Sequence, residues 1–261
     1  MQLSLIEASP PVIAALHLAD FALSRHRPMS WFEEYAIANA RVFAEAGVPW
    51  IKLQDQTRTS GPAAPETLAM MAALGRLIRA EFPQLGLGII VEAHDPTAAL
   101  SIAHAAGAGF VRLKVFVGGA MTAEGPRYGL GAAAVGHRAA LGWPDIAILA
   151  DVHDRTGRPL SDETQPFAAE WAAKAGADGL IVTGSRFSDT LSRVATVRQA
   201  VSGRPLLIGG GVSDANVAAA LAASDGVIVS SALMRHDATD DDLVRWDTER
   251  CLRFMDAAGA A

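Results

Sequence analysis

The sequence has a single cysteine, Cys251, among its 261 residues. One cysteine excludes an internal disulfide framework and fits a reducing compartment, so we expect a cytoplasmic protein. Charged residues are also sparse, at 19%, and 28 acidic residues outnumber 22 lysines and arginines. A net charge of −6 without a basic stripe argues against nucleic-acid binding.

Long hydrophobic runs are missing too. No stretch reaches the ~18 apolar residues of a membrane span, and no basic segment followed by a long apolar core marks a secretory signal. Linkers, charge blocks and low-complexity segments are absent. What remains is a 51% hydrophobic chain with 24 glycines, which is ample for a large core. The length predicts a single domain over residues 1–261, because α/β barrels run to roughly 250 residues.

Short apolar runs alternate with amphipathic stretches from end to end. The predicted strands are Ile13–Leu18, Trp50–Gln54, Leu87–Glu92, Phe110–Phe116, Ile146–Val152, Gly179–Gly184, Leu206–Gly209 and Val227–Ser230. The predicted helices are Ser30–Ala46, Pro65–Phe82, Pro96–Ala106, Gly131–Leu141, Thr164–Ala175, Asp189–Val201, Ser213–Ala223 and Asp240–Ala258. Eight strand–helix units predict an α/β protein with one (β/α)8 TIM barrel. A flavodoxin-like sheet is the alternative, but it needs fewer units.

Side-chain alternation gives the first five strands one apolar and one polar face. Residues two apart on a strand point to the same side. Leu16 and Leu18 belong to the apolar face, which we expect to pack on the helices. The polar face holds His17, Lys52, Gln54, Glu92, Arg112, Lys114, Asp151 and His153. We therefore expect this face to point into the barrel, with its strand ends at the carboxyl-terminal mouth, where such barrels carry their active sites.

Charges inside a barrel are costly unless they are paired or used in chemistry. The candidate catalytic residues, all near the strand ends, are Glu92, Lys114, Asp151 and His17. Lys114 suits an ion pair, a phosphate contact, a general acid or a Schiff-base amine. Lys52 and Arg112 sit earlier on their strands, so we predict that they are buried structural partners of carboxylates. Gln54 and His153 are predicted to contact the substrate.

A divalent cation is a second interpretation of the same residues. Glu92 with His94, and Asp151 with His153, each place a carboxylate and an imidazole two residues apart, which are donors that suit a metal. Against this, Asp95-Pro96 predicts a helix start that turns His94 away. The resident cofactor and any metal ligands therefore stay open. The next two residues, Asp154 and Arg155, are predicted to form a solvated loop pair.

The glycine run near the end of the chain predicts an anion site. An apolar strand ends in Gly209, Gly210 and Gly211, and Ser213 has the character of a helix N-cap. Glycines admit close approach of an anion to the backbone, and a helix start offers free N–H groups. Because loops after the last two barrel strands often bind phosphate, we predict a small phosphorylated ligand there. The predicted contacts are Gly209, Gly210, Gly211, Ser230, Ser231, Thr183 and Gly184.

Eight motifs in this order resemble those of the BtpA/SgcQ family over nearly the whole chain. They are Leu16-His-Leu18, Ala98-Ala-Leu-Ser-Ile-Ala103, Phe110-Val-Arg-Leu-Lys-Val115, Thr122-Ala-Glu-Gly125, Ala150-Asp-Val-His153, Ala177-Asp-Gly-Leu-Ile-Val-Thr-Gly184, the glycine run with Val212 and Asn216, and Asp225-Gly-Val-Ile-Val229. The resemblance implies a phosphate-binding TIM barrel. The family takes its name from a role in photosystem I accumulation, and other members occur beside sugar-uptake and sugar-phosphate genes.

The chain departs from the family pattern near its strand ends. Gln54-Asp55 stands where a Glu-Asn pair is usual, Lys114 replaces an Asn, and Arg155-Thr156 replaces a Lys-His pair. The glycine run replaces a Gly-Ser-Gly, which still suits phosphate. These departures indicate a divergent member with its own substrate.

Motifs and polar face together predict an enzyme acting on a phosphorylated sugar or ribosyl-phosphate compound. Isomerisation, lyase chemistry and glycosyl transfer all suit these residues. The alternative is a non-catalytic assembly or regulatory factor of the BtpA type, and a divalent-metal-dependent hydrolase is third. We also expect a homo-oligomer.

Overall fold

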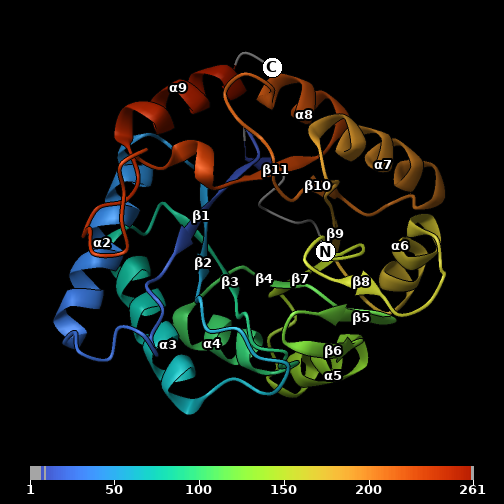
Figure 1. The fold of residues 1–261 in the computed structure, drawn as a ribbon, viewed down its shortest axis with the longest axis horizontal. Helices are drawn as coiled ribbons and strands as arrows, with labels where there is room; N and C mark the ends of the chain where they lie inside the picture. Colours follow the sequence, from blue (N-terminus) through green and yellow to red (C-terminus); the bar gives the residue numbers. More distant parts are fainter. Residues whose placement is uncertain (1–6, 9, 260–261) are drawn as a thin grey trace.

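Eight parallel strands close into a barrel in the computed structural model, which describes residues 7, 8 and 10–259 (Figure 1). The barrel strands are β1 (Val12–His17), β2 (Trp50–Gln54), β3 (Gly86–Ile90), β4 (Phe110–Leu113), β7 (Ala147–Asp151), β9 (Gly179–Val182), β10 (Leu206–Ile208) and β11 (Gly226–Val229). β1 pairs with both β2 and β11, which closes the ring. The predicted (β/α)8 barrel is confirmed.

Helices surround the barrel, one after each strand, as Figure 1 shows. They are α2 (Met29–Glu45), α3 (Pro65–Glu81), α4 (Ala98–Ala106), α5 (Gly131–Ala140), α6 (Gln165–Lys174), α7 (Phe187–Ala200), α8 (Val217–Ala223) and α9 (Thr248–Gly259). A short 3-10 turn, η1 (Ser231–Leu233), follows β11. No helix among the described residues combines the length and the apolar character needed to cross a membrane.

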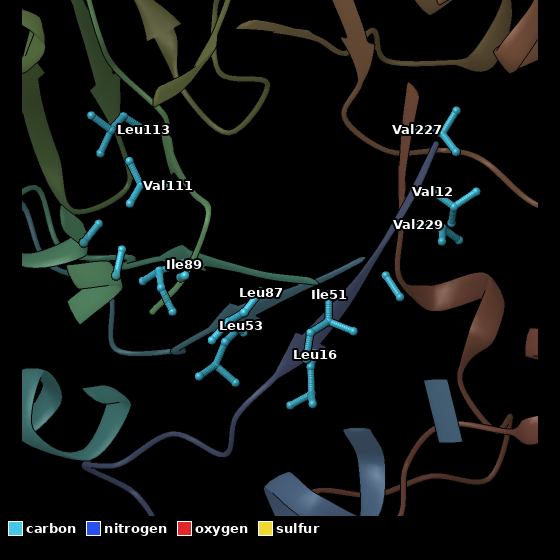
Figure 2. Close-up of a cluster of buried hydrophobic side chains, with 14 of the residues drawn as sticks. Val12, Leu16, Ile51, Leu53, Leu87, Ile89, Val111, Leu113, Val227 and Val229 are labelled. Atoms are coloured by element: carbon cyan, nitrogen blue, oxygen red, sulfur yellow. The ribbon is translucent and has the colours of Figure 1, made fainter. Parts of the chain in front are cut away.

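The two faces of the strands pack into separate cores, as the alternation predicts. Leu16, Ile51, Leu53 and Val111 belong to the large cluster between barrel and helices, part of which Figure 2 shows. The strand faces inside the barrel form a smaller apolar cluster of Ile13, Phe110, Ala147, Leu149, Ile181, Leu207 and Ile228, with Trp50 against it. Above this cluster the inward positions turn polar. The interior is therefore an apolar floor beneath a charged mouth.

Two aromatic rings fill the barrel floor because β3 is glycine-rich. A Cβ at Gly86 would lie 2.2 Å from the Trp50 ring, and one at Gly88 would lie 2.1 Å from the Phe110 ring. The rings of Trp50 and Phe110 are tilted, with centroids 5.8 Å apart. Side chains at Gly86 and Gly88 would displace the two rings. The two glycines therefore let the rings close the amino-terminal end of the barrel.

The long connection after β4 is a β-hairpin. Its strands β5 (Gly119–Thr122) and β6 (Gly125–Tyr128) pair antiparallel, and β5 also pairs with β8 (Arg158–Pro159). The buried Arg127 guanidinium donates to the backbone oxygens of Thr59 and Glu92, at 2.9 and 3.0 Å. The hairpin therefore joins the loops that follow β2, β3 and β7.

Two predicted helix starts are wrong. Ser213 does not open α8, because the Asn216 side chain accepts from the Ser213 N–H and donates to the Gly211 carbonyl, which makes a turn before the helix. The last helix begins at Thr248 instead of Asp240. There the backbone N–H groups of Arg245 and Trp246 donate to the buried Asn39 side chain and are not available to a helix.

Candidate active site

A polar cleft of about 290 Å³ opens at the carboxyl-terminal end of the barrel. Residues of β1, β2 and β11 and the loops after β3, β4, β7 and β10 contribute to it. Its polar and glycine lining residues are His17, Lys52, Gln54, Arg58, Glu92, Arg112, Lys114, Asp154, Arg155, Thr156, Gly209, Gly210, Gly211, Ser230 and Ser231. Most side chains of the predicted polar face thus meet in one cavity.

Glu92 is the hub of the hydrogen bonds in the cleft. The Lys114 Nζ donates to Glu92 Oε2 at 2.7 Å, and the Gln54 Nε2 donates to Glu92 Oε1 at 2.8 Å. The Arg58 guanidinium lies 3.7 Å from Glu92 Oε2. The Glu92 side chain is only 1% exposed, so its charge is matched inside the barrel. Gln54 in turn accepts a 2.5 Å hydrogen bond from Lys52.

Arg112 and Asp151 form a second buried ion pair. Arg112 Nε donates to Asp151 Oδ2 at 2.8 Å, and Arg112 Nη2 donates to Oδ1 at 2.7 Å. Such a bidentate pair fixes both groups in plane. The prediction that Arg112 partners a carboxylate is confirmed. For Lys52 the same prediction is wrong, because no carboxylate oxygen of the described residues lies within 4.0 Å of its amine and its partner is an amide oxygen.

His17 is a neutral imidazole at the cleft wall. Burial lowers the pKa of His17 to about 3. Its Nε2 lies 3.4 Å from the Ser230 hydroxyl, and its backbone oxygen accepts from the buried Tyr35 hydroxyl at 2.8 Å. A neutral imidazole can donate through one nitrogen and accept through the other.

The predicted phosphate contacts in the cleft are Ser230 and Ser231, close to His17, and the glycine run after β10. Gly211 has φ of 76°, a left-handed conformation that suits glycine. Gly209 is needed for a different reason, because a Cβ there would lie 2.3 Å from Thr183 Oγ1. At Gly210 a Cβ would meet only the Arg155 guanidinium, at 3.9 Å. The backbone of Gly210 is therefore bare on the side that faces this cation.

Three charged residues of the cleft do not belong to the polar strand face that the sequence predicts. Arg58 and Arg155 come from the loops after β2 and β7, and Asp154 precedes Arg155. The prediction that Asp154 is solvated together with Arg155 is wrong. Asp154 is buried, and its carboxylate accepts from the Thr156 N–H and hydroxyl. Their side chains enter through irregular loops, where strand alternation gives no signal. The one sequence signal for Arg155 is that Arg155-Thr156 replaces the Lys-His pair of the motifs that the chain resembles.

Some predicted site residues lie outside the cleft. Thr183 sits against Gly209, and the Gly184 N–H is bonded to the Thr190 hydroxyl at 2.9 Å. Asp151 and His153 line a smaller pocket of about 20 Å³ under the hairpin. His153 has φ of 56°, and its Nε2 lies 3.7 Å from Glu163 Oε1. Lys114 and Asp154 line both cavities, so the pocket is the cleft's neighbour.

The carboxylate–histidine pairs do not converge on one point. His94 Nε2 accepts from the Tyr128 N–H at 3.1 Å, away from the cleft, and Asp151 is held by Arg112. Within the described part of the chain, no group of three or more His, Cys, Asp and Glu side chains is placed to hold a metal. The donors present here do not fit the predicted divalent-cation site.

Cationic groups outnumber anionic ones around the cleft. Arg58, Arg112, Lys114 and Arg155 face Glu92 and Asp154. An excess of positive charge in a concave, low-dielectric site favours an anionic ligand. Fold and cleft together define a (β/α)8 barrel with a polar, cation-rich cavity at the end where such barrels carry their sites.

The chain belongs to the BtpA family, whose model matches residues 8–260. It is 29% identical over 254 residues to the photosystem I biogenesis protein BtpA of Synechocystis sp., covering 95% of this chain and 87% of the relative. It is 32% identical over 204 residues to an uncharacterised protein of Pyrococcus horikoshii, covering 75% of this chain and 76% of that protein. The predicted family is confirmed.

Among solved structures, phosphoribosyl anthranilate isomerase from Thermus thermophilus matches with a TM-score of 0.54. The match covers 95% of this chain and 98% of the isomerase, at 13% identity. At that identity the likeness shows the shared barrel fold.

Proposed function

We propose that this protein is an enzyme that binds a small phosphorylated sugar or ribosyl-phosphate compound and carries out proton-transfer chemistry on it. The observation that carries the proposal is the meeting, in one cleft, of the glycine run, the two serines after β11, and the interior charges Glu92 and Lys114. The proposal assigns the phosphate to the glycine run and the two serines, and the reactive groups to the residues around Glu92 and to His17.

The anchor proposed for the phosphate is the wall between Gly209–Gly211 and Ser230–Ser231. Its support is the bare backbone of Gly210 beneath the Arg155 guanidinium and the neighbouring serine hydroxyls, a combination of donors that matches phosphate oxygens. α8 is too short and begins too late to take part, so the anchor is built from loop backbone and side chains.

The proposed reactive groups surround Glu92. A carboxylate with Gln54 and Lys114 as partners can accept a substrate proton, and the Lys114 ammonium can stabilise the negative charge that follows. The neutral imidazole of His17, which lies beside Ser230, can relay a proton between ligand oxygens. The Arg112–Asp151 pair supports these groups from below, where both Asp151 oxygens are engaged.

Titration calorimetry with inorganic phosphate and with ribose 5-phosphate tests the anchor. We expect Arg155→Gln to weaken both ligands about tenfold or more, because a charge-assisted hydrogen bond contributes roughly 1.5–3 kcal/mol. Arg158→Gln is the matched control, since Arg158 is exposed on β8 and does not line the cleft. Unchanged affinity in Arg155→Gln, or equal losses in both variants, would contradict the anchor.

A second candidate is a non-catalytic assembly factor that retains the barrel. The observation in its favour is the Synechocystis relative, which is named for photosystem I biogenesis. The two candidates differ in one result. An enzyme turns over at least one member of a panel of phosphorylated sugars and loses that activity in Glu92→Gln, whereas an assembly factor turns over none.

A further inference from the structure

Lysine is rare in this chain and two of its copies lie inside the barrel. Only three lysines, Lys52, Lys114 and Lys174, occur among the 22 lysine and arginine residues. Lys174 is on α6 with a side chain 74% exposed, paired with Glu170. The chain otherwise uses arginine for its positive charges. The two interior lysines are exceptions, and each places a primary amine inside the barrel.

Lys52 has an unusual environment for a buried lysine. It is 3% exposed, it lines the floor of the cleft, and its hydrogen-bond partner is the uncharged Gln54 oxygen at 2.5 Å. Its register neighbours on the adjoining strands are Gly88 and Ala15, and Ala15 also lines the cleft. A buried lysine normally has a carboxylate partner, because an unpaired ammonium is expensive to bury.

Burial, followed by the charge of Arg112, holds the pKa of the Lys52 amine well below its ordinary value. Glu92 and Asp151 act in the opposite direction without overcoming this, and Lys114 adds to the lowering. An amine without its proton has a free electron pair and is a nucleophile at neutral pH.

Lys114 differs from Lys52 on each of these points. Its Nζ is 2.7 Å from Glu92 Oε2 and its side chain is 12% exposed, at the mouth and not on the floor. An ion-paired ammonium has no free electron pair with which to attack carbon. Of the chemical roles open to the two residues, nucleophilic attack fits Lys52 and charge stabilisation fits Lys114.

We propose that Lys52 is a nucleophile that forms an imine with the carbonyl group of a phosphorylated aldehyde or ketone bound in the cleft. The inference rests on the proposed function for the phosphate and adds the substrate class, an open-chain carbonyl compound, to it. Isomerisation and carbon–carbon cleavage next to the carbonyl are the reactions that an imine assists.

The step balances within the site. Lys52 Nζ forms a bond to the carbonyl carbon, the carbon–oxygen double bond breaks, and the oxygen leaves as water with the two protons of the amine. The imine nitrogen then takes one proton from solvent. As a cation it withdraws electrons from the adjacent carbon, and Glu92, which lines the same cleft, accepts a proton from that carbon. Hydrolysis of the imine returns the amine.

Borohydride trapping tests the proposal on the intact protein. Glycolaldehyde phosphate is the probe, glycolaldehyde is its matched analogue without phosphate, and peptide mapping by mass spectrometry locates the reduced adduct. We expect one adduct, on Lys52, in the wild type and in Lys174→Met. It should be lost in Lys52→Arg, which keeps a cation but has no primary amine. Circular dichroism checks that each variant is folded.

The outcomes separate the two proposals. Labelling of Lys52 at least about tenfold faster with the phosphorylated probe supports both, the rate ratio reflecting the added binding energy of the phosphate. Labelling of Lys52 at equal rates with both probes supports the nucleophile and contradicts the phosphate anchor. Labelling confined to Lys174 or Lys114, while calorimetry still detects phosphate binding, overturns the nucleophile and leaves the anchor standing. A Lys52 labelling rate that stays level from neutral to mildly acidic pH would match an amine already without its proton.

Discussion

Replacing Asp151 with asparagine should destabilise the protein strongly, because it leaves Arg112 charged and unpaired inside the barrel. The two side chains are only 10% and 4% exposed for Arg112 and Asp151, and both hydrogen bonds are shorter than 2.9 Å. Asparagine keeps the shape but presents an amide N–H₂ to one of the two guanidinium donors. Removing one member of a buried ion pair costs about 3–5 kcal/mol.

The melting temperature should then fall by roughly 6–20 °C, taking about 2–4 °C per kcal/mol for a chain of this size. Lys114→Met is the comparison, since it leaves Glu92 with the Gln54 amide and the nearby Arg58. We expect it to cost no more than about 1–3 kcal/mol, the usual penalty for a buried group that loses one partner. Thermal and urea unfolding followed by circular dichroism measure both.

A double replacement isolates the pair itself. Arg112→Met with Asp151→Leu removes both charges, and an apolar pair of similar volume is often neutral or better. We expect the double variant to recover most of the stability that Asp151→Asn loses. An Asp151→Asn protein within about 1 kcal/mol of wild type would refute this reasoning, because the lost charge would then not have been balancing Arg112.

The remaining predictions concern Asp55 and the hairpin. Burial raises the pKa of Asp55 to about 6, from 3.8, so its folded form holds a proton more tightly and its contribution to stability falls as pH rises from about 4 to about 6. His17, with its lowered pKa, changes stability with pH in the opposite direction, so the quantity to measure is the stability difference between Asp55→Asn and wild type. In chemical denaturation, the free energy of unfolding of the variant should rise by up to about 3 kcal/mol relative to wild type between about pH 4 and pH 6. A stability difference independent of pH would contradict the assignment. Arg127→Gln should speed hydrogen exchange in β5 and β6 about tenfold or more while sparing β1, since its two backbone contacts hold the hairpin. Equal changes in exchange rate in the hairpin and in β1 would contradict a local role of Arg127.

The sequence by itself determined the barrel and the direction of most interior side chains. Eight strand–helix units are a local, repeated pattern, and alternation fixes which face of each strand is inward; His17, Gln54, Glu92 and Lys114 therefore reached the cleft as predicted from their positions alone. The glycine run marked the part of the cleft that follows β10. The family's motifs follow the same strand ends.

Only the tertiary structure decided which interior charges meet. Alternation has a period of two along one strand, but the partner of a side chain depends on the stagger between neighbouring strands, which no single strand encodes. Thus Asp151 pairs with Arg112, Lys114 pairs with Glu92, and Lys52 donates to the amide oxygen of Gln54. Arg155 entered the cleft through a loop, where backbone geometry and not periodicity sets side-chain direction.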